Sequence, residues 1–329
     1  MNHKTSTLEK INEIVEELDP ILKEGENKKF SSEKISNLLA ILLFSITRST
    51  GQKLIEIRDY RQIEREGPFR YAGQVETLYE EDLFPHDLYT FFKKLGLDRH
   101  VGPSYLRVKG LLTHQKIRHF FAKQLSFRIY EYVKKTPLKK DGVILFLPNM
   151  TGGAWIGDET KRVCEETYGD NICGYKIWPC TPYARKTRKP IEVLEKKPRL
   201  VDFVEGLVPE PEETALILNF EELRTSAETT KNAVKGLRYF GYDEENKVRV
   251  AGVCVFEYNH PVCKERLERL GVDSLYLVDG RTFFRVSYEK GFISQFQYKT
   301  VIDWLNDPWE FTRKILPVLK KRKELEKRP

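Results

Sequence analysis

Two adjacent carboxylates follow one of the most apolar segments of the chain. Residues 215–220 read Ala-Leu-Ile-Leu-Asn-Phe and are followed directly by Glu221 and Glu222. Two carboxylates at the end of a strand can bind the vicinal hydroxyl groups of a ribose, directly or through Mg²⁺, which prefers oxygen ligands. The same pair could instead be an ordinary acidic loop, and its position alone favours neither interpretation.

The residues after this pair could bind a phosphate. They lie at the start of a predicted helix, where unpaired backbone N–H groups point towards an anion, and they are Thr225, Ser226, Ala227, Glu228 and Thr229. The alternative is structural, because Thr225 and Glu228 have the spacing of a capping box.

A glycine-bearing turn offers a second anion site. Thr151, Gly152 and Gly153 follow the apolar segment 143–147, and adjacent glycines allow backbone N–H groups to approach an anion closely. The turn matches neither the P-loop nor the dinucleotide-binding pattern. A tight connection with no ligand would have the same sequence.

A basic run could supply positive charge to the same ligand. It contains Arg185, Lys186, Arg188 and Lys189. Such a loop can close over a polyphosphate as a lid. A solvated surface loop would have the same composition.

The elements that must position these residues follow from the hydrophobic pattern. Apolar runs typical of strands alternate with helical segments at about 154–168, 226–240 and 262–270, and the runs are 143–147, 175–178, 215–220, 248–256 and 274–278. This alternation predicts an α/β fold whose parallel sheet is covered on both faces. Ligands of such folds bind beyond the carboxyl ends of the strands, so we expect the candidate groups to share one cleft.

The rest of the chain divides by pattern. Residues 1–125 show helical spacing, which predicts a mainly helical N-terminal domain. We assign residues 126–285 to the α/β domain and residues 286–329 to a C-terminal helical extension with a basic tail. The tail could bind nucleic acid or be a solvated helix end.

Composition excludes several classes of protein. The 329 residues carry a net charge of +7, well short of a histone-like excess, and no apolar stretch approaches the roughly 20 residues that span a bilayer. The N-terminus has no signal-peptide core, so we expect a soluble, cytoplasmic protein without a membrane partner. Five cysteines without CxxC spacing argue against a disulfide framework or a structural zinc site.

Taken in order along residues 130–280, these segments resemble the type I phosphoribosyltransferases, and specifically the orotate type. Thr151 to Gly153 resemble that family's pyrophosphate loop, Arg185 to Lys189 its flexible basic loop, and residues 216–229 its diphosphate-sugar motif. Three departures stand out. Glu221-Glu222 replaces Asp-Asp, Ser226-Ala227-Glu228-Thr229 replaces Thr-Gly-Gly-Thr, and the basic loop lacks His-Gly. The motif is therefore degraded, with a carboxylate where the family binds a 5′-phosphate.

The resemblance implies a type I phosphoribosyltransferase sheet and transfer of a phosphoribosyl group from phosphoribosyl diphosphate to a base or another nucleophile. Glu221 and Glu222 would bind the ribose hydroxyls or Mg²⁺. Thr225 to Thr229 would hold the 5′-phosphate and Thr151 to Gly153 the pyrophosphate, while Arg185, Lys186 and Lys189 would stabilise the leaving charge.

Other functions stay open. The degraded motif and the long helical N-terminal region suit a non-catalytic module that senses a nucleotide or acts as an effector. A nucleic-acid-modifying protein is a third hypothesis. A homodimer is a further possible partner arrangement, as is a protein or nucleic acid bound through residues 1–125 or the basic tail.

Overall fold

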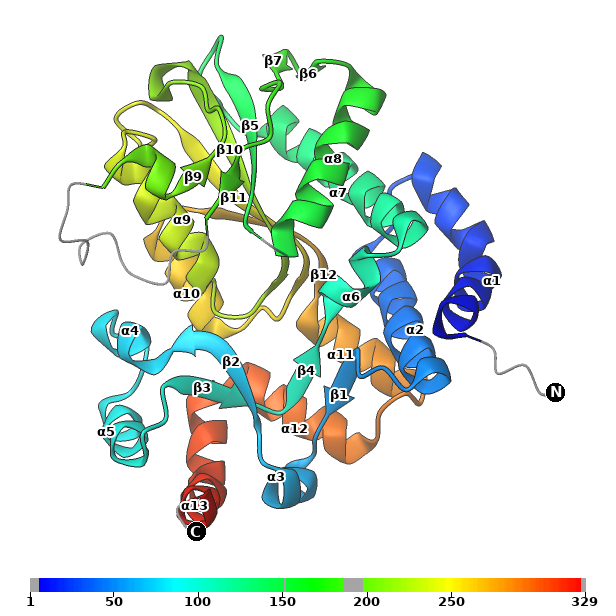
Figure 1. The fold of residues 1–329 in the computed structure, drawn as a ribbon, viewed down its shortest axis with the longest axis vertical. Coiled ribbons are helices and arrows are strands. Elements are labelled where there is room, and N and C mark those ends of the chain that lie inside the picture. Colours follow the sequence, from blue (N-terminus) through cyan, green and yellow to red (C-terminus); the bar gives the residue numbers. More distant parts are fainter. Residues whose placement is uncertain (1–5, 151, 186–197, 327–329) are drawn as a thin grey trace.

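A parallel sheet forms the centre of the molecule. The computed structural model describes residues 6–150, 152–185 and 198–326. Within them, four parallel strands pair in the order β12-β11-β10-β5, as Figure 1 shows. These strands are β5 (Val143–Pro148), β10 (Thr214–Arg224), β11 (Arg249–Glu257) and β12 (Asp273–Asp279). The predicted α/β fold with a parallel sheet is confirmed.

The strands bury apolar side chains on both faces of the sheet, which stabilises them in its interior. In β5, Ile144 and Phe146 belong to one buried cluster, whereas Leu145 and Leu147 belong to another. Successive side chains of a strand point to opposite faces, so a continuous apolar run is satisfied only where both faces are covered.

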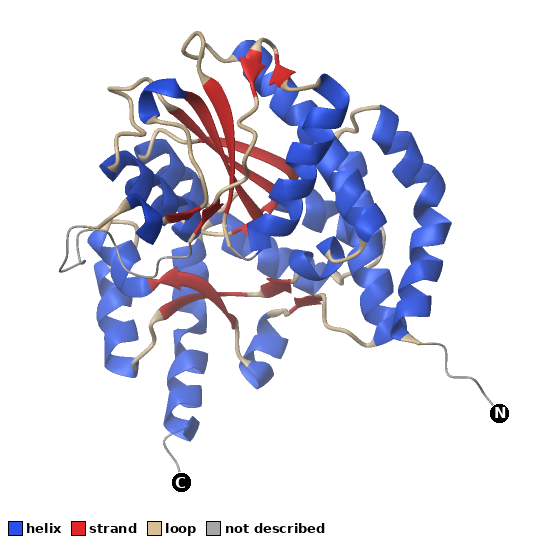
Figure 2. Ribbon diagram, turned by 45° about the horizontal axis from the view of Figure 1, so that its top comes forward, coloured by secondary structure: helices blue, strands red, loops and turns tan. Residues whose placement is uncertain are grey.

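Helices provide that cover, and Figure 2 shows the sheet between them. The first face packs against α2 (Ser32–Thr50), α7 (Gln115–Lys135), α8 (Gly152–Tyr168) and α11 (Gly280–Glu289). The second packs against α9 (Glu228–Tyr239) and α10 (Pro261–Arg269). The helices expected at about 154–168, 226–240 and 262–270 are therefore present.

One predicted strand differs. Residues 175–178 do not form a strand of the sheet. They contribute β7 (Tyr175–Lys176), which pairs with β6 (Asn171–Ile172) in an antiparallel hairpin, and a single parallel bridge joins Ile177 to Ile144. The backbone of Trp178 still donates to the carbonyl of Ile144, at 2.9 Å, so the segment follows the edge of β5 without continuing along it.

The N-terminal region is mainly helical but contains two short antiparallel ribbons. Its helices are α1 (Thr7–Asn27), α2, α3 (Tyr60–Glu66), α4 (Val75–Glu80), α5 (His86–Leu95), α6 (Val108–Leu112) and α7. The ribbons pair β1 (Ile55–Ile57) with β4 (Ser104–Leu106) and β2 (Phe69–Gln74) with β3 (Arg99–Gly102). The chain closes with α12 (Gln295–Asn306) and α13 (Pro308–Glu326). In the part of the chain that the structure describes, none of the helices is both long and apolar enough to cross a bilayer.

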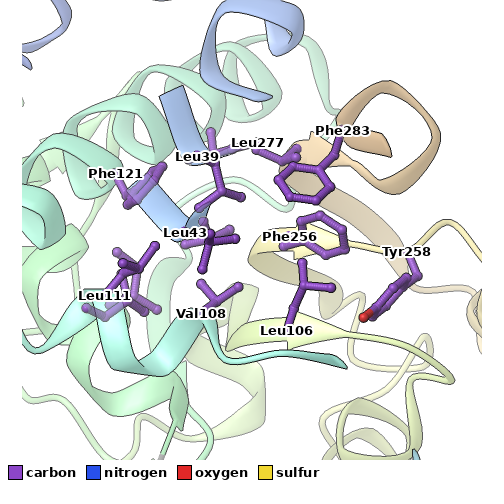
Figure 3. Close-up of a cluster of buried hydrophobic side chains, with 14 of the residues drawn as sticks. Leu39, Leu43, Leu106, Val108, Leu111, Phe121, Phe256, Tyr258, Leu277 and Phe283 are labelled. Atoms are coloured by element: carbon purple, nitrogen blue, oxygen red, sulfur yellow. The ribbon is translucent and has the colours of Figure 1, made fainter. Parts of the chain in front are cut away.

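The N-terminal region and the sheet share one hydrophobic core. In Figure 3, Leu43 of α2 and Val108 of α6 lie near Phe256 of β11 and Phe283 of α11. Helix α7 also runs without a break through position 125, the predicted domain boundary. The division into domains at 125 and 285 stays a prediction, and the packing joins the first two of these segments closely.

Candidate functional site

A cavity of about 330 Å³ opens at the carboxyl ends of β5 and β10. Its lining comes from four places in the chain: α6, the turn after β5, the end of β10, and the turn into α9. The residues are Lys109, Asn149, Met150, Gly152, Gly153, Glu221, Glu222, Leu223, Thr225, Ser226, Ala227, Glu228 and Thr229. Most of the candidate residues from the sequence therefore lie around one space.

Strand pairing brings these segments together. Phe220 lies opposite Pro148 in the parallel pair, so the residues after both positions leave the sheet at the same edge. The backbone of Asn149 donates to the carbonyl of Phe220 at 3.0 Å and fixes this alignment.

The two adjacent glycines have different structural roles. A Cβ atom on Gly153 would lie 2.0 Å from the carbonyl oxygen of Phe220, so this glycine lets α8 begin directly against β10. A Cβ on Gly152 would lie 1.8 Å from Oε2 of Glu222. The Glu222 carboxylate therefore lies against the first residue of α8, where the positive end of the helix dipole stabilises an anion.

Glu221 is buried, with 6% of its surface exposed, and its carboxylate has polar neighbours on both oxygens. Its Oε1 accepts hydrogen bonds from Asn149 Nδ2 at 3.4 Å and from Thr230 Oγ1 at 3.3 Å. Its Oε2 lies 3.9 Å from Nε of Arg224. This carboxylate is held in place by groups of the protein itself.

Arg224 links the cavity to the far strand of the sheet. Its side chain is fully buried, and Nη1 donates to Oε2 of Glu257 at 2.7 Å and to Oγ of Ser274 at 2.8 Å. A guanidinium stays charged in proteins, so it compensates the negative charge of both Glu221 and Glu257.

Glu228, the first residue of α9, forms ion pairs with two cations of the protein. Its carboxylate lies 3.0 Å from Lys231 Nζ and 3.0 Å from Arg266 Nη1. Both cations also contact Glu81, at 2.9 Å and 2.7 Å, so the four side chains form a ring of alternating charge. Lys231 and Arg266 are each 2% exposed, which makes this an ion-pair network inside the protein rather than a surface contact.

The predicted capping box is wrong. Helix α9 begins at Glu228, and the cap residue is Ala227, which has no side-chain cap hydrogen bond. Glu228 is therefore the first residue of the helix and cannot return to the backbone of Thr225 from a third position. Ala227 has a φ of +55°, the left-handed conformation that glycine adopts most easily.

The remaining phosphate-site candidates line the cavity with partial or full burial. Thr225 and Thr229 are half-buried, and Ser226 is 4% exposed. The carbonyl of Ser226 accepts a hydrogen bond from Arg266, which fixes the turn against α10.

The basic run begins at the rim of this site. The backbone of Met150 donates to the carbonyl of Ala184 at 2.9 Å, so β8 (Tyr183–Ala184) lies beside the turn after β5. β8 pairs with β9 (Val204–Glu205), and Arg185 is exposed, 3.6 Å from Glu205. Thr151, Lys186 and Lys189 lie outside the described residues.

Two polar residues of the cavity, Asn149 and Lys109, were not among the candidates. Asn149 follows β5 directly, and a polar residue at a strand end is a signal that could have found it. Its amide also pairs with that of Asn219, at 3.0 and 3.1 Å. Lys109 comes from α6, more than 100 residues before β10, and no local pattern marks it.

Thiol and metal chemistry find little support in the described residues. Burial raises the pKa of the thiols of Cys164, Cys254 and Cys263, which keeps them protonated. The described part of the chain holds no group of three or more His, Cys, Asp or Glu side chains suited to a metal ion. Mg²⁺ that binds chiefly to a substrate's phosphates needs only one or two carboxylates, which this cavity has.

Comparison with protein-family models gives no match, and comparison with curated proteins gives none either. Solved structures give weak similarity. UMP synthase of Leishmania donovani is 15% identical with a TM-score of 0.40, over 63% of this chain and 36% of that one. A phosphoribosyltransferase of Corynebacterium diphtheriae is 13% identical with a TM-score of 0.34, over 54% and 89%.

A protein of Aquifex aeolicus is 14% identical with a TM-score of 0.34, over 60% of this chain and 85% of that one. Similarity at this level does not by itself assign an activity or a ligand to the chain. The parallel sheet and the helical N-terminal region, which rest on the structure itself, are consistent with a fold of the type I phosphoribosyltransferase kind.

Proposed function

We propose that this cavity binds phosphoribosyl diphosphate or a nucleotide, and that the chain is a phosphoribosyltransferase-like protein. In this proposal it transfers the phosphoribosyl group to a base or another nucleophile and releases pyrophosphate. One observation carries the proposal: two carboxylates, a glycine turn and a hydroxyl-rich helix start line one cavity at the carboxyl ends of adjacent parallel strands.

Each part of the cavity has a role in this proposal. Glu222 is only half-buried and borders the cavity, so it is the better placed carboxylate for ribose hydroxyls. Thr225, Ser226 and Thr229, with the N–H groups at the start of α9, would bind the 5′-phosphate. When bound, Mg²⁺ would offset the negative charge of the diphosphate, and Glu222 and Glu221 are the residues that would hold it.

Positive side chains would stabilise the charge that develops on the pyrophosphate as its bond to C1′ of the ribose breaks. Lys109 borders the cavity. Arg185 is the first cation of the basic run and lies near the cavity rim, and we assign the same role to Lys186 and Lys189.

Calorimetric titration with phosphoribosyl diphosphate, with and without Mg²⁺, tests the proposal. Orotate and purine bases are then added separately, and pyrophosphate is measured. We expect Mg²⁺-dependent binding that Glu222→Gln weakens about tenfold or more, because a hydrogen bond to a charged group contributes about 1.5–3 kcal/mol. The control is Glu13→Gln, the same change at an exposed residue of α1. A folded protein that binds no phosphoribosyl diphosphate would overturn the proposal.

A non-catalytic nucleotide-sensing or effector module is the second candidate, and a specific observation favours it. The Glu222 carboxylate lies at the start of α8, where a bound anion would lie, and Glu221 is already compensated by Arg224. In such a module Glu222→Gln would strengthen anion binding, since it removes a built-in negative charge. The direction of this one change, together with the presence or absence of pyrophosphate release, separates the two candidates.

A further inference from the structure

A second cavity, of about 410 Å³, lies between α3, the start of α12 and α13. It shares no residue with the candidate site, and Figure 1 shows these three helices together at the bottom of the view. Its lining combines aromatic rings with cations: Asp59, Tyr60, Arg61, Phe296, Lys299, Thr300, Asp303 and Lys314.

The three cations of this cavity have no acidic partner. Arg61, Lys299 and Lys314 are exposed, and no carboxylate in the described ranges 6–150, 152–185 and 198–326 lies within 4.0 Å of their charged groups. Their neighbour Arg313 shows the contrast, because it pairs with Asp87 at 3.0 Å. Three cations without an acidic partner surround one cavity, against two carboxylates in its lining, so the cavity carries a net positive charge.

The two carboxylates of the cavity are engaged with other groups. Asp59 caps α3 and accepts a hydrogen bond from the backbone of Gln62 at 2.8 Å. Asp303 accepts one from the hydroxyl of Tyr60 at 3.3 Å. These contacts fix the carboxylates in the wall and leave the cations to face a ligand.

An exposed aromatic ring completes the site. Phe296, in the first turn of α12, is 64% exposed, and the guanidinium carbon of Arg61 lies 5.7 Å from the centre of its ring. An exposed aromatic ring with cations around it is the combination that stacks a nucleic-acid base and contacts its phosphates, whatever the base.

The positive charge continues along α13. Lys314 and Lys321 are seven residues apart and therefore share a face of the helix, about 10 Å from each other. Nη1 of Arg322 donates to the carbonyl of Arg65 at 3.1 Å, so this end of α13 lies against α3. The basic surface is thus longer than one nucleotide and fits a chain of phosphates better than a mononucleotide. Residues 327–329 of the predicted basic tail lie outside the described residues.

We propose that this surface binds single-stranded nucleic acid, with a base stacked on Phe296 and its flanking phosphates on Arg61, Lys299 and Lys314. This site shares no residue with the cavity at the carboxyl ends of β5 and β10. Binding at this surface would hold a nucleic acid on the same protein as the proposed nucleotide-binding cavity at the carboxyl ends of β5 and β10.

Fluorescence anisotropy with labelled single-stranded DNA and RNA oligonucleotides tests this proposal over a range of salt concentrations. We expect Phe296→Ala to weaken binding about 5- to 150-fold, the range that corresponds to 1–3 kcal/mol of stacking. Lys314→Glu should weaken binding and lower the salt dependence, because each phosphate contact contributes roughly one unit to its slope. The matched control is Lys140→Glu, at an exposed lysine near the start of β5.

Circular dichroism and urea unfolding establish that the variants are folded, which is expected because both side chains are exposed. The proposal is overturned if wild-type protein binds neither oligonucleotide, or if Phe296→Ala binds like wild type. It is also overturned if Lys140→Glu weakens binding as much as Lys314→Glu. Competition by AMP as strong as that by the oligonucleotide would contradict a chain ligand.

Discussion

The adjacent glycines at the start of α8 allow one mutation to be compared at two neighbouring positions. We expect Gly153→Ala to reduce the free energy of unfolding substantially and Gly152→Ala to change it little. Neither glycine has a positive φ, so backbone strain does not distinguish them. What differs is the atom that a new methyl group would meet.

At Gly153 the methyl group would meet backbone. It would lie 2.0 Å from the carbonyl oxygen of Phe220 and 2.8 Å from its carbonyl carbon, and both atoms are fixed by the sheet. Reaching even a tight contact of 3.0 Å requires a shift of about 1 Å. Overpacking of this kind typically costs about 1–3 kcal/mol, and sometimes more.

At Gly152 the methyl group would meet the end of a flexible side chain, the Glu222 carboxylate. That side chain can rotate towards the cavity. The loss of its interaction with the helix dipole, about 0.3–1 kcal/mol, is offset in part by the better helix propensity of alanine. We therefore expect Gly153→Ala to be less stable than Gly152→Ala by about 2 kcal/mol.

Urea unfolding followed by circular dichroism measures both values under the same conditions. The wild type and the two variants should unfold with the same dependence on urea concentration, so that the difference reports stability alone. Equal stabilities of the two variants would refute the assignment of Gly153 to helix–strand packing. A larger loss at Gly152 would do the same.

Three further predictions use the same urea assay. Ala227→Gly should stabilise the protein by about 1 kcal/mol, because Ala227 has a φ of +55°, which glycine adopts more easily. Ala233→Gly, inside α9, should destabilise the protein by about the same amount. A change of the same sign at both positions would contradict this prediction. Arg224→Met should cost about 3–5 kcal/mol, since it leaves two buried carboxylates without their cation. A loss below about 1 kcal/mol would count against this explanation. Burial, with a smaller contribution from Arg266, lowers the pKa of His100 to about 3. The unfolded chain therefore takes up a proton at His100 below about pH 6.5 that the folded chain does not, and this one group should lower stability by up to about 1.4 kcal/mol per pH unit from there. His100→Phe should make this slope shallower, and an unchanged slope would mean that another group causes it.

Much of the sheet could be predicted from local patterns. Continuous apolar runs between helical segments require cover on both faces, which restricts them to a parallel sheet with helices on each side. Parallel strands also bring their carboxyl ends to one edge, so residues 70 positions apart, such as Gly152 and Glu222, could be expected near each other. The segment 175–178 shows the limit of this reasoning, because a short apolar run can equally pair as an edge hairpin.

The N-terminal region illustrates a different limit. Helical spacing in α1, α2 and α7 predicts the helices and their apolar faces. It does not say which surface those faces cover, and in the folded chain they complete the core of the sheet. The contribution of Lys109 to the cavity follows from that packing alone.

The sequence by itself determined which residue types stand at the ends of the strands, because hydrophobic periodicity and turn chemistry are local properties. Only the tertiary structure decided which ion pairs the charged residues form. Arg224 pairs with Glu257, which is 33 residues away in the sequence. Arg266 pairs with Glu81, which is 185 residues away. Glu228 pairs with Lys231 and Arg266 instead of completing the capping box that its spacing suggested. Electrostatic partners in a protein interior are chosen by proximity in space, and a buried charge takes the nearest opposite charge however distant it is along the chain.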